Sequence, residues 1–179
     1  VRGGYSPQTR QQTANAIYAR AQMPLILDDL QLTVGGRESR VKDIDLRNNQ
    51  NNSHSRFVKE IGLTYQLSAE QRLFLRRDES FRYANMDELA ALPAGETFLK
   101  PQEGTSLELG WEWSQSTTQL QATVFQLDLD NEIKYNAATF ANENLDESRR
   151  RGLILSARHG LTPDLQLTGN YSYTDSEIK

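Results

Sequence analysis

The chain has 179 residues, a formal net charge of -4 and no cysteine, so disulfides, thiolate zinc sites and cysteine nucleophiles are excluded. Hydrophobic residues make up 37% and charged residues 25%, which is polar for a compact core but not polar enough for disorder. The basic residues are scattered, so nucleic acid is not an expected partner. No stretch approaches the ~18 consecutive apolar residues of a membrane-spanning helix, so any membrane crossing has to use strands.

Apolar and polar residues alternate along most of the chain, which indicates strands with two different faces. The clearest runs lie between Leu30 and Gly35, between Glu60 and Leu67, and between Ser106 and Trp113. With the less regular runs included, the pattern predicts about eight strands. In chain order they are Gln12–Gln22, Leu30–Lys42, Arg56–Leu67, Gln71–Asp78, Thr105–Ser114, Gln119–Asp130, Arg150–Arg158 and Leu165–Thr174.

The connections between these strands alternate between short and long. The short ones are Met23–Asp29, Leu67–Gln71, Ser114–Gln119 and Arg158–Leu165, and the long ones are Asp43–Ser55, Glu79–Gly104 and Asn131–Arg149. In an antiparallel sheet this places all short turns at one end and all long loops at the other, which is typical of a bacterial outer-membrane barrel. Within the longest loop, a capping Asn85 followed by Asp87 and Glu88 predicts a short helix over Asn85–Leu92.

The two faces of the predicted strands differ in chemistry. Aromatic residues near strand ends share the apolar faces, as in the girdles at a membrane surface, although core aromatics of a soluble sheet would give the same pattern. Charged residues on the opposite faces favour a wet lumen. The lipid-facing aromatics are Tyr65, Trp111, Trp113, Tyr171 and Tyr173, and the lumen-facing polar residues are Glu60, Arg76, Glu108, Glu112, Asp128 and Asn170.

The acidic stretch at Asp128–Glu132 resembles a calcium loop only superficially, because the required glycine and distal glutamate are not in place. We expect Asp128 and Asp130 to face the lumen instead, opposite Phe125 and Leu127. His54 and His159 lie far apart without ligand-like spacing, and no catalytic motif or cofactor fingerprint is present. The sequence therefore predicts no metal site, no cofactor and no enzymatic activity.

Several runs, taken in order, resemble the TonB-dependent receptors that import ferric siderophores, haem or cobalamin. The first is similar to the family's strand pair ending in GGR, and the last to its NYxYxDxE strand. Ala84 and Ile154 depart from the pattern, which has Pro and a lumen-facing Glu at these places. The matching runs are AIYARAQMPLILDDLQLTVGGRES, IGLTYQLSAEQRLFLRRDESFRYANMDEL, FLKPQEGTSLELGWEW, ATVFQLDLDNEIKY and ESRRRGLILSARHGLTPDLQLTGNYSYTDSEI.

The resemblance implies an all-β, antiparallel meander that forms part of a transmembrane β-barrel. The family's barrel has about 22 strands around an N-terminal plug. Nothing in the sequence resembles the plug, and the start VRGGYSPQTR lacks the layout of a signal peptide. We therefore expect residues 1–179 to be a segment of the barrel domain, with the plug domain absent. A self-contained eight-stranded structural or adhesive barrel is the alternative.

The function implied by the resemblance is active transport across the bacterial outer membrane. The expected partners are a ferric siderophore or a related nutrient complex, the lipid bilayer, and the TonB system acting through the plug. Arginines and aromatics near the outer strand ends are candidates for contacting an anionic ligand, although the run Arg149–Arg151 also fits a solvated strand entry. The candidate ligand-binding residues are Arg76, Arg82, Tyr83 and Arg150.

Overall fold

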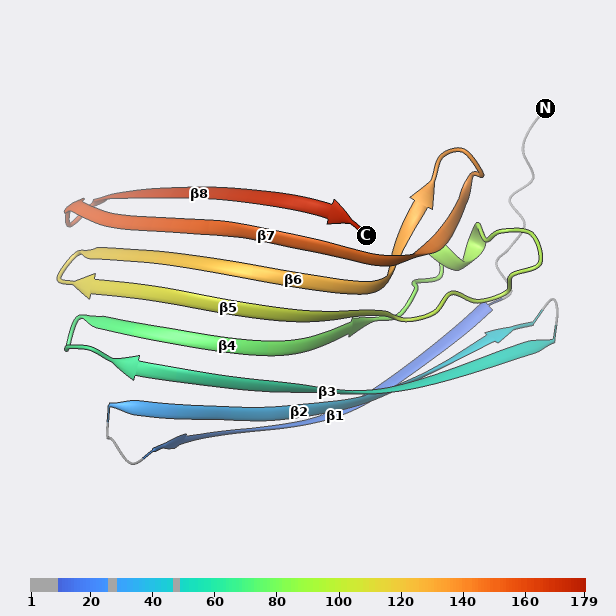
Figure 1. Cartoon of the computed structure of the whole chain (residues 1–179), viewed down its shortest axis with the longest axis horizontal. Helices are drawn as coiled ribbons and strands as arrows, with labels where there is room; N and C mark the ends of the chain where they lie inside the picture. The colour runs from blue at the N-terminus through green and yellow to red at the C-terminus, as the bar shows by residue number, and fades with distance from the viewer. Residues whose placement is uncertain (1–9, 26–28, 47–48) are drawn as a thin grey trace.

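A computed structural model describes residues 10–25, 29–46 and 49–179, which form one antiparallel sheet of eight strands (Figure 1). Each strand pairs with its neighbours in sequence, so the predicted all-β meander is confirmed. The observed strands are longer than predicted at most of their ends. They are β1 (Arg10–Pro24), β2 (Leu30–Asp45), β3 (Gln50–Gln66), β4 (Gln71–Arg82), β5 (Gln102–Gln115), β6 (Thr118–Asn136), β7 (Ala141–Thr162) and β8 (Leu165–Ile178).

The sheet is open. β1 and β8 lie at its opposite margins, and within the described ranges they do not pair with each other (Figure 1). The β3–β4, β5–β6 and β7–β8 connections gather at one end, the turn end, and the β4–β5 and β6–β7 connections lie at the other, the loop end. Of these, only the β4–β5 connection is long. No helix in the described part of the chain is both long and apolar enough to span a membrane.

Along β5 and β6, the face more exposed to solvent is the apolar one. Leu107 and Leu109 are 49% and 51% exposed, and Val124, which opposes Leu109 in the register, is 48% exposed. On the opposite face, Thr33 and Thr123 are buried. We call the face of Leu109 the outer face and the face of Thr123 the inner face. A soluble protein would cover the apolar face, whereas a barrel wall in a bilayer leaves it to the lipid.

Two of the predicted long loops are mostly strand. The β6–β7 hairpin continues to Asn136 and resumes at Ala141, where a loop over Asn131–Arg149 was predicted. Likewise β2 runs to Asp45 and β3 begins at Gln50. Both extensions carry mixed polar residues, so the apolar alternation that marks a strand is missing from their sequence.

The β6–β7 hairpin bends away from the sheet at its loop end (Figure 1). Asn131, which the β6–β7 register skips, has a positive φ of 53°, a left-handed conformation that asparagine adopts more readily than most residues. The bend brings Ile133 against the segment 83–101 that connects β4 to β5. Here the only core cluster found among the described residues forms from Ala84, Leu89, Leu99 and Ile133.

The helix predicted over Asn85–Leu92 is one 3₁₀ turn, η1 (Glu88–Ala90). The residue at the N-cap of η1 is Asp87, whose side chain makes no capping bond, and the predicted capping role of Asn85 takes the form of a hydrogen-bonded pair with Glu88. The Asn85 Oδ1 accepts a hydrogen bond from the Glu88 backbone N–H at 2.8 Å, and the Glu88 carboxylate accepts one from the Asn85 N–H at 2.8 Å. This reciprocal arrangement is a capping box, which satisfies two backbone donors at the start of the turn.

The predicted facing of Asp128 and Asp130 is wrong. Asp128 opposes Thr105 and Arg149 in the register, so it lies on the outer face, and its carboxylate pairs with the Arg149 guanidinium. Phe125 and Leu127 of the same strand turn inward, with Phe125 opposite Glu108. Phe125 lies over Gly152, where a side chain would overlap its ring, and an aromatic ring over a strand glycine compensates for the missing side chain.

Candidate functional site

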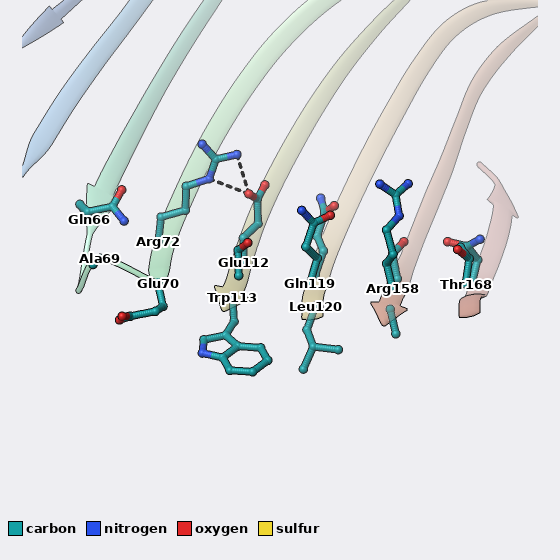
Figure 2. Close-up of a pocket in the computed structure, with 15 residues that line it drawn as sticks. Gln66, Ala69, Glu70, Arg72, Glu112, Trp113, Gln119, Leu120, Arg158 and Thr168 are labelled. Atoms are coloured by element: carbon teal, nitrogen blue, oxygen red, sulfur yellow. Dashed lines mark hydrogen bonds and ion pairs between the residues drawn. The ribbon is translucent and has the colours of Figure 1, made fainter. Parts of the chain in front are cut away.

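Arginine–carboxylate pairs line the inner face from its turn end to its middle. Arg72 and Glu112 are directly opposed on β4 and β5, with 2.5 Å between Nη2 and Oε2 (Figure 2). Arg76 contacts Asp78 at 2.5 Å and Glu108 at 3.1 Å. Opposite charges placed across neighbouring strands stabilise the pairing of the strands and leave the wall polar with little net charge.

The inner face is recessed near the turn end. A hollow of about 650 Å³ is lined by Arg72, Glu112, Gln119, Arg158 and other polar residues. Figure 2 shows Arg72 and Arg158 extending to one side of the sheet while the Trp113 and Leu120 side chains point to the other. The alternation predicted for β5 is therefore present in the structure, with charges inside and Trp113 outside.

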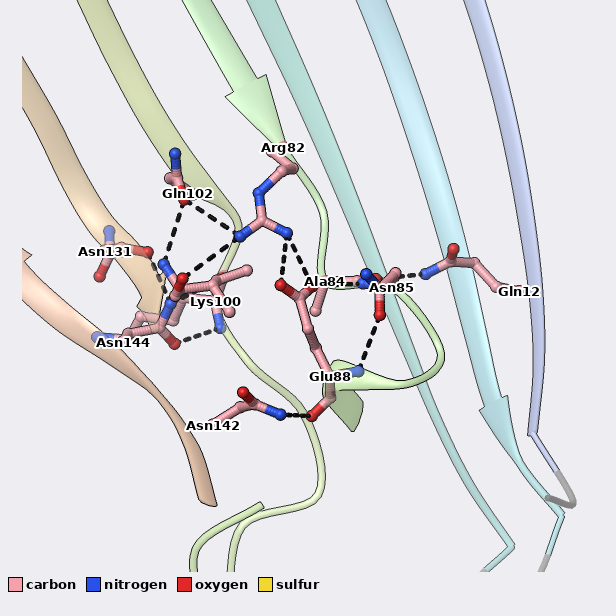
Figure 3. A network of polar contacts seen from close by, with 11 residues as sticks. Gln12, Arg82, Ala84, Asn85, Glu88, Lys100, Gln102, Asn131, Asn142 and Asn144 are labelled. Atoms are coloured by element: carbon pink, nitrogen blue, oxygen red, sulfur yellow. Dashed lines mark hydrogen bonds and ion pairs between the residues drawn. The ribbon is translucent and has the colours of Figure 1, made fainter. Parts of the chain in front are cut away.

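A network of polar contacts centred on Arg82 fills the loop end (Figure 3). Arg82 Nη1 donates to both carboxylate oxygens of Glu88 at 2.7 and 2.8 Å, and Nη2 contacts Gln102 Oε1 at 3.4 Å and the Ile133 carbonyl at 3.5 Å. Because Glu88 also caps η1 through Asn85, Arg82 fixes the turn to the ends of β4, β5 and β6. Its guanidinium is used in holding the loop.

Segment 83–101 is tied to both halves of the sheet. Asn144 exchanges hydrogen bonds with the Lys100 backbone at 2.9 and 3.0 Å, and the Asn142 amide donates to the Glu88 carbonyl at 3.0 Å (Figure 3). On the other side, the Gln12 amide of β1 donates to the Ala84 carbonyl at 3.0 Å. The segment therefore acts as a brace between β1 and the β6–β7 hairpin.

Tyr83 belongs to the same brace. Its hydroxyl contacts the Ser39 carbonyl at 3.1 Å and the His54 carbonyl at 3.5 Å, and its ring stacks on the His54 ring with 6.4 Å between centroids.

Arg150, on β7, pairs with the Glu132 carboxylate, and the Ser148 hydroxyl bonds the other oxygen of that carboxylate at 2.5 Å.

The four residues predicted to contact ligand do not form one cluster. Arg76 lies on the middle wall, Arg82 and Tyr83 lie in the brace, and Arg150 lies beside the bend of β6. Each of the three guanidiniums contacts at least one carboxylate. Arg82 and Arg150 nevertheless converge, because they bind the adjacent residues Ile133 and Glu132.

The structure also brings together residues that sequence reasoning missed. On the inner face Tyr18 of β1 opposes Arg37 of β2, and the Arg37 guanidinium lies over the Phe81 ring at 5.5 Å from its centroid. The spacing of these residues in the sequence does not predict that they lie together. They come from three strands, and the pairing of the strands brings them close. No group of three or more histidine or acidic residues placed to hold a metal occurs among the described residues.

Comparison with known proteins identifies the architecture. The family described as TonB dependent receptor-like, beta-barrel matches residues 1–179. No curated protein sequence matches the chain. Among solved structures, the chain is similar to the copper transporter OprC, with a TM-score of 0.79 and 16% identity over 95% of this chain and 29% of that one.

Two further solved structures are similar over the same region. The ferric-catecholate import receptor Fiu from K12 E. coli has a TM-score of 0.75 and 21% identity over 95% of this chain and 28% of its own. The ferripyoverdine receptor of the outer membrane of Pseudomonas aeruginosa, bound to ferripyoverdine, has a TM-score of 0.76 and 19% identity, with 93% and 23% covered. The chain spans less than a third of each of these three structures. At this identity the likeness shows the fold.

Proposed function

Because the chain belongs to the family of TonB-dependent receptor-like β-barrels, we propose that it is part of an outer-membrane receptor for active transport of a ferric siderophore or a similar nutrient complex, such as haem or cobalamin. Residues 1–179 would form a segment of the barrel domain. A plug domain, through which the TonB system acts, would be supplied by another part of the receptor. The residues described here contribute wall and loops rather than catalytic groups.

The distribution of polarity between the two faces carries this proposal. Leu107, Leu109 and Val124 are about half exposed on the outer face, while polar side chains such as Thr123 are buried on the inner one. An apolar face of this extent is unfavourable in water and favourable against lipid tails. A polar inner wall suits the passage of a hydrated or charged cargo.

The brace supports a role at the outer entrance. Segment 83–101 lies at the loop end and is held by Arg82, Tyr83, Asn142 and Asn144. In barrels of this type the long loops are extracellular, so a ligand first meets this end. A preorganised loop loses less conformational entropy when the ligand binds.

The fold does not identify the ligand, because receptors with this fold are named for different ligands. The chemistry of the residues that line the barrel has to indicate it. One of the similar structures is called a copper transporter and another a ferric-catecholate import receptor. Arg82 and Arg150 bring positive charge to the loop end, where an anionic complex would compete with Glu88 and Glu132 for their guanidiniums. Such charge-assisted hydrogen bonds are stronger than neutral ones.

Uptake by the full-length receptor tests the proposal. A bacterial strain lacking the receptor gene is complemented, and accumulation of radiolabelled ferric siderophores, haem and cobalamin is measured with and without a functional TonB. We expect TonB-dependent accumulation of one class of complex. Absence of uptake for all of them, together with a defect in adhesion or envelope integrity, would favour a structural or adhesive barrel instead.

The candidate ligand contacts are tested in the same assay. Arg76→Ala, Arg82→Ala and Arg150→Ala each remove one guanidinium, and we expect each to reduce uptake at limiting ligand. Arg72→Ala is the matched control, because it breaks the same kind of ion pair at the turn end. Equal amounts of receptor at the cell surface have to be verified. Normal uptake by all three variants would show that these residues are not required for ligand uptake.

A further inference from the structure

The sheet forks between β3 and β4. Their pairing runs from the Gln66–Arg72 pair at the turn end to the Glu60–Asp78 pair and stops there, although both strands continue toward the loop end. The two strands diverge beyond this point (Figure 1). A recess of about 790 Å³ lies at the fork and is lined by residues of β1, β2, β3 and β4.

Four side chains of the fork recess matter for its chemistry. Tyr18, Arg37 and Val58 form one row across the inner face, because Arg37 pairs with Tyr18 on β1 and with Val58 on β3. Phe81 belongs to the side of β4 that also carries Leu75, but beyond the end of the β3–β4 pairing its ring lies 5.5 Å from the Arg37 guanidinium carbon. The Arg37 guanidinium therefore lies over one aromatic ring, and Tyr18 is its neighbour in the register.

Arg37 differs from its neighbours in charge balance. Arg20, Arg76 and Arg82 each lie within ion-pair distance of a carboxylate. Among the residues that the structure describes, Arg37 makes no hydrogen bond or ion pair, its guanidinium lies over the Phe81 ring, and its side chain is exposed. Its five N–H donors are thus open to a ligand from the lumen.

The Phe81 ring is held in place by its contact with Tyr83. The two ring centroids lie 5.2 Å apart, and the Tyr83 hydroxyl bonds the Ser39 carbonyl two residues beyond Arg37. Ser39 is buried, so this contact is anchored in the sheet. The ring that faces Arg37 is therefore positioned by the brace, which gives the recess a defined shape before any ligand arrives.

We infer that the fork recess is a binding subsite for an anionic ligand group that carries flat aromatic rings, and that Arg37 is its selectivity-determining residue. The guanidinium supplies planar, charge-assisted donors, and Phe81 with Tyr18 supplies stacking surfaces. An uncharged, non-aromatic complex gains from neither feature. This inference rests on the proposed function and names the chemistry of the cargo.

Binding to the purified full-length receptor in detergent provides the test. The probes are an anionic ferric tris-catecholate complex and an uncharged ferric tris-hydroxamate complex. Arg37→Gln is expected to weaken binding of the catecholate complex by about tenfold or more and to change hydroxamate binding by less than about twofold. Arg37→Lys, which keeps the charge but loses the planar fork, is expected to fall between wild type and Arg37→Gln.

Two further variants keep the test specific. Phe81→Leu removes the stacking ring while keeping an apolar side chain. It is expected to weaken binding of the catecholate complex and to leave hydroxamate binding unchanged. This variant also tests the inference if Arg37→Gln does not fold. Arg158→Gln is the matched control, because Arg158 is also an inner-face arginine without a carboxylate partner in the described ranges, but lies at the turn end. It should leave both affinities unchanged.

The outcomes separate the two proposals. Unchanged catecholate binding in both Arg37→Gln and Phe81→Leu would overturn the inference, as would equal loss for the two probes. A wild-type receptor that binds and imports only uncharged complexes would overturn it too, while the transport function would stand. Failure to import any complex in cells would count against the proposed function itself.

Discussion

Substitution of Leu109 by arginine tests the facing of the wall. Leu109 lies near the middle of β5 on the outer face, opposite Leu75 and Val124, and none of these neighbours offers a carboxylate. A guanidinium there would have to enter the lipid unpaired. At the midplane of such a barrel this costs about 2–4 kcal/mol.

The adjacent Glu108 provides the contrast. Its carboxylate faces inward and lies 3.1 Å from Arg76, in a pair whose side chains are 48% and 25% exposed. A partly exposed pair of this kind contributes about 0–1 kcal/mol, so Glu108→Gln should be nearly neutral. The two positions are neighbours in sequence and lie on opposite faces of the sheet.

The measurement is the free energy of unfolding of the full-length receptor in lipid vesicles, obtained from urea titrations, with heat-modifiable gel mobility as a check of assembly. We expect a clear loss for Leu109→Arg and little change for Glu108→Gln. Equal losses for the two variants, or a larger loss for Glu108→Gln, would refute the assigned facing.

Three other predictions concern the brace, the wall and the sheet margins. Arg82→Ala should speed proteolytic cleavage within residues 83–101 on intact cells, because the contacts to Glu88 and Ile133 are lost together, and cleavage at the wild-type rate would contradict the role of the brace. Gly110→Val should destabilise the receptor by about 1–3 kcal/mol, because the new side chain overlaps the Phe74 ring, and adding Phe74→Ala should recover most of the loss in urea titrations; a fully stable single variant would show that the ring moves freely. Residues 1–179 expressed alone should associate in detergent-free buffer, since the margins at β1 and β8 leave backbone donors and acceptors unpaired, and a monodisperse monomer in sedimentation would argue against this.

The sequence determined the strands and their order. Alternation of apolar and polar residues over Leu107–Trp113 and similar runs located the strands. Among regular backbones, only a strand places every second residue on the same face. The alternation of short and long connections placed the turns at one end. Both signals are local, and they could be derived without knowing what any strand pairs with.

Where local signals disappear, the prediction from sequence failed. Asn131–Arg149 carries polar residues on both sides, so the continuation of β6 to Asn136 and of β7 from Ala141 was not visible. The facing of Asp128 was inverted because Phe125 and Leu127 look like a lipid face. The register with β5 turns them inward instead, where Phe125 covers a glycine.

The candidate site depended on tertiary structure most of all. Sequence reasoning selected Arg76, Arg82 and Arg150 because they are cations near strand ends, but could not show that each faces a carboxylate on another segment. It also passed over Arg37, whose neighbours Tyr18 and Phe81 lie 19 positions before it and 44 after it in the chain. Whether a charge is neutralised or available is set by partners across strands, and only the register of the folded sheet decides which residues those partners are.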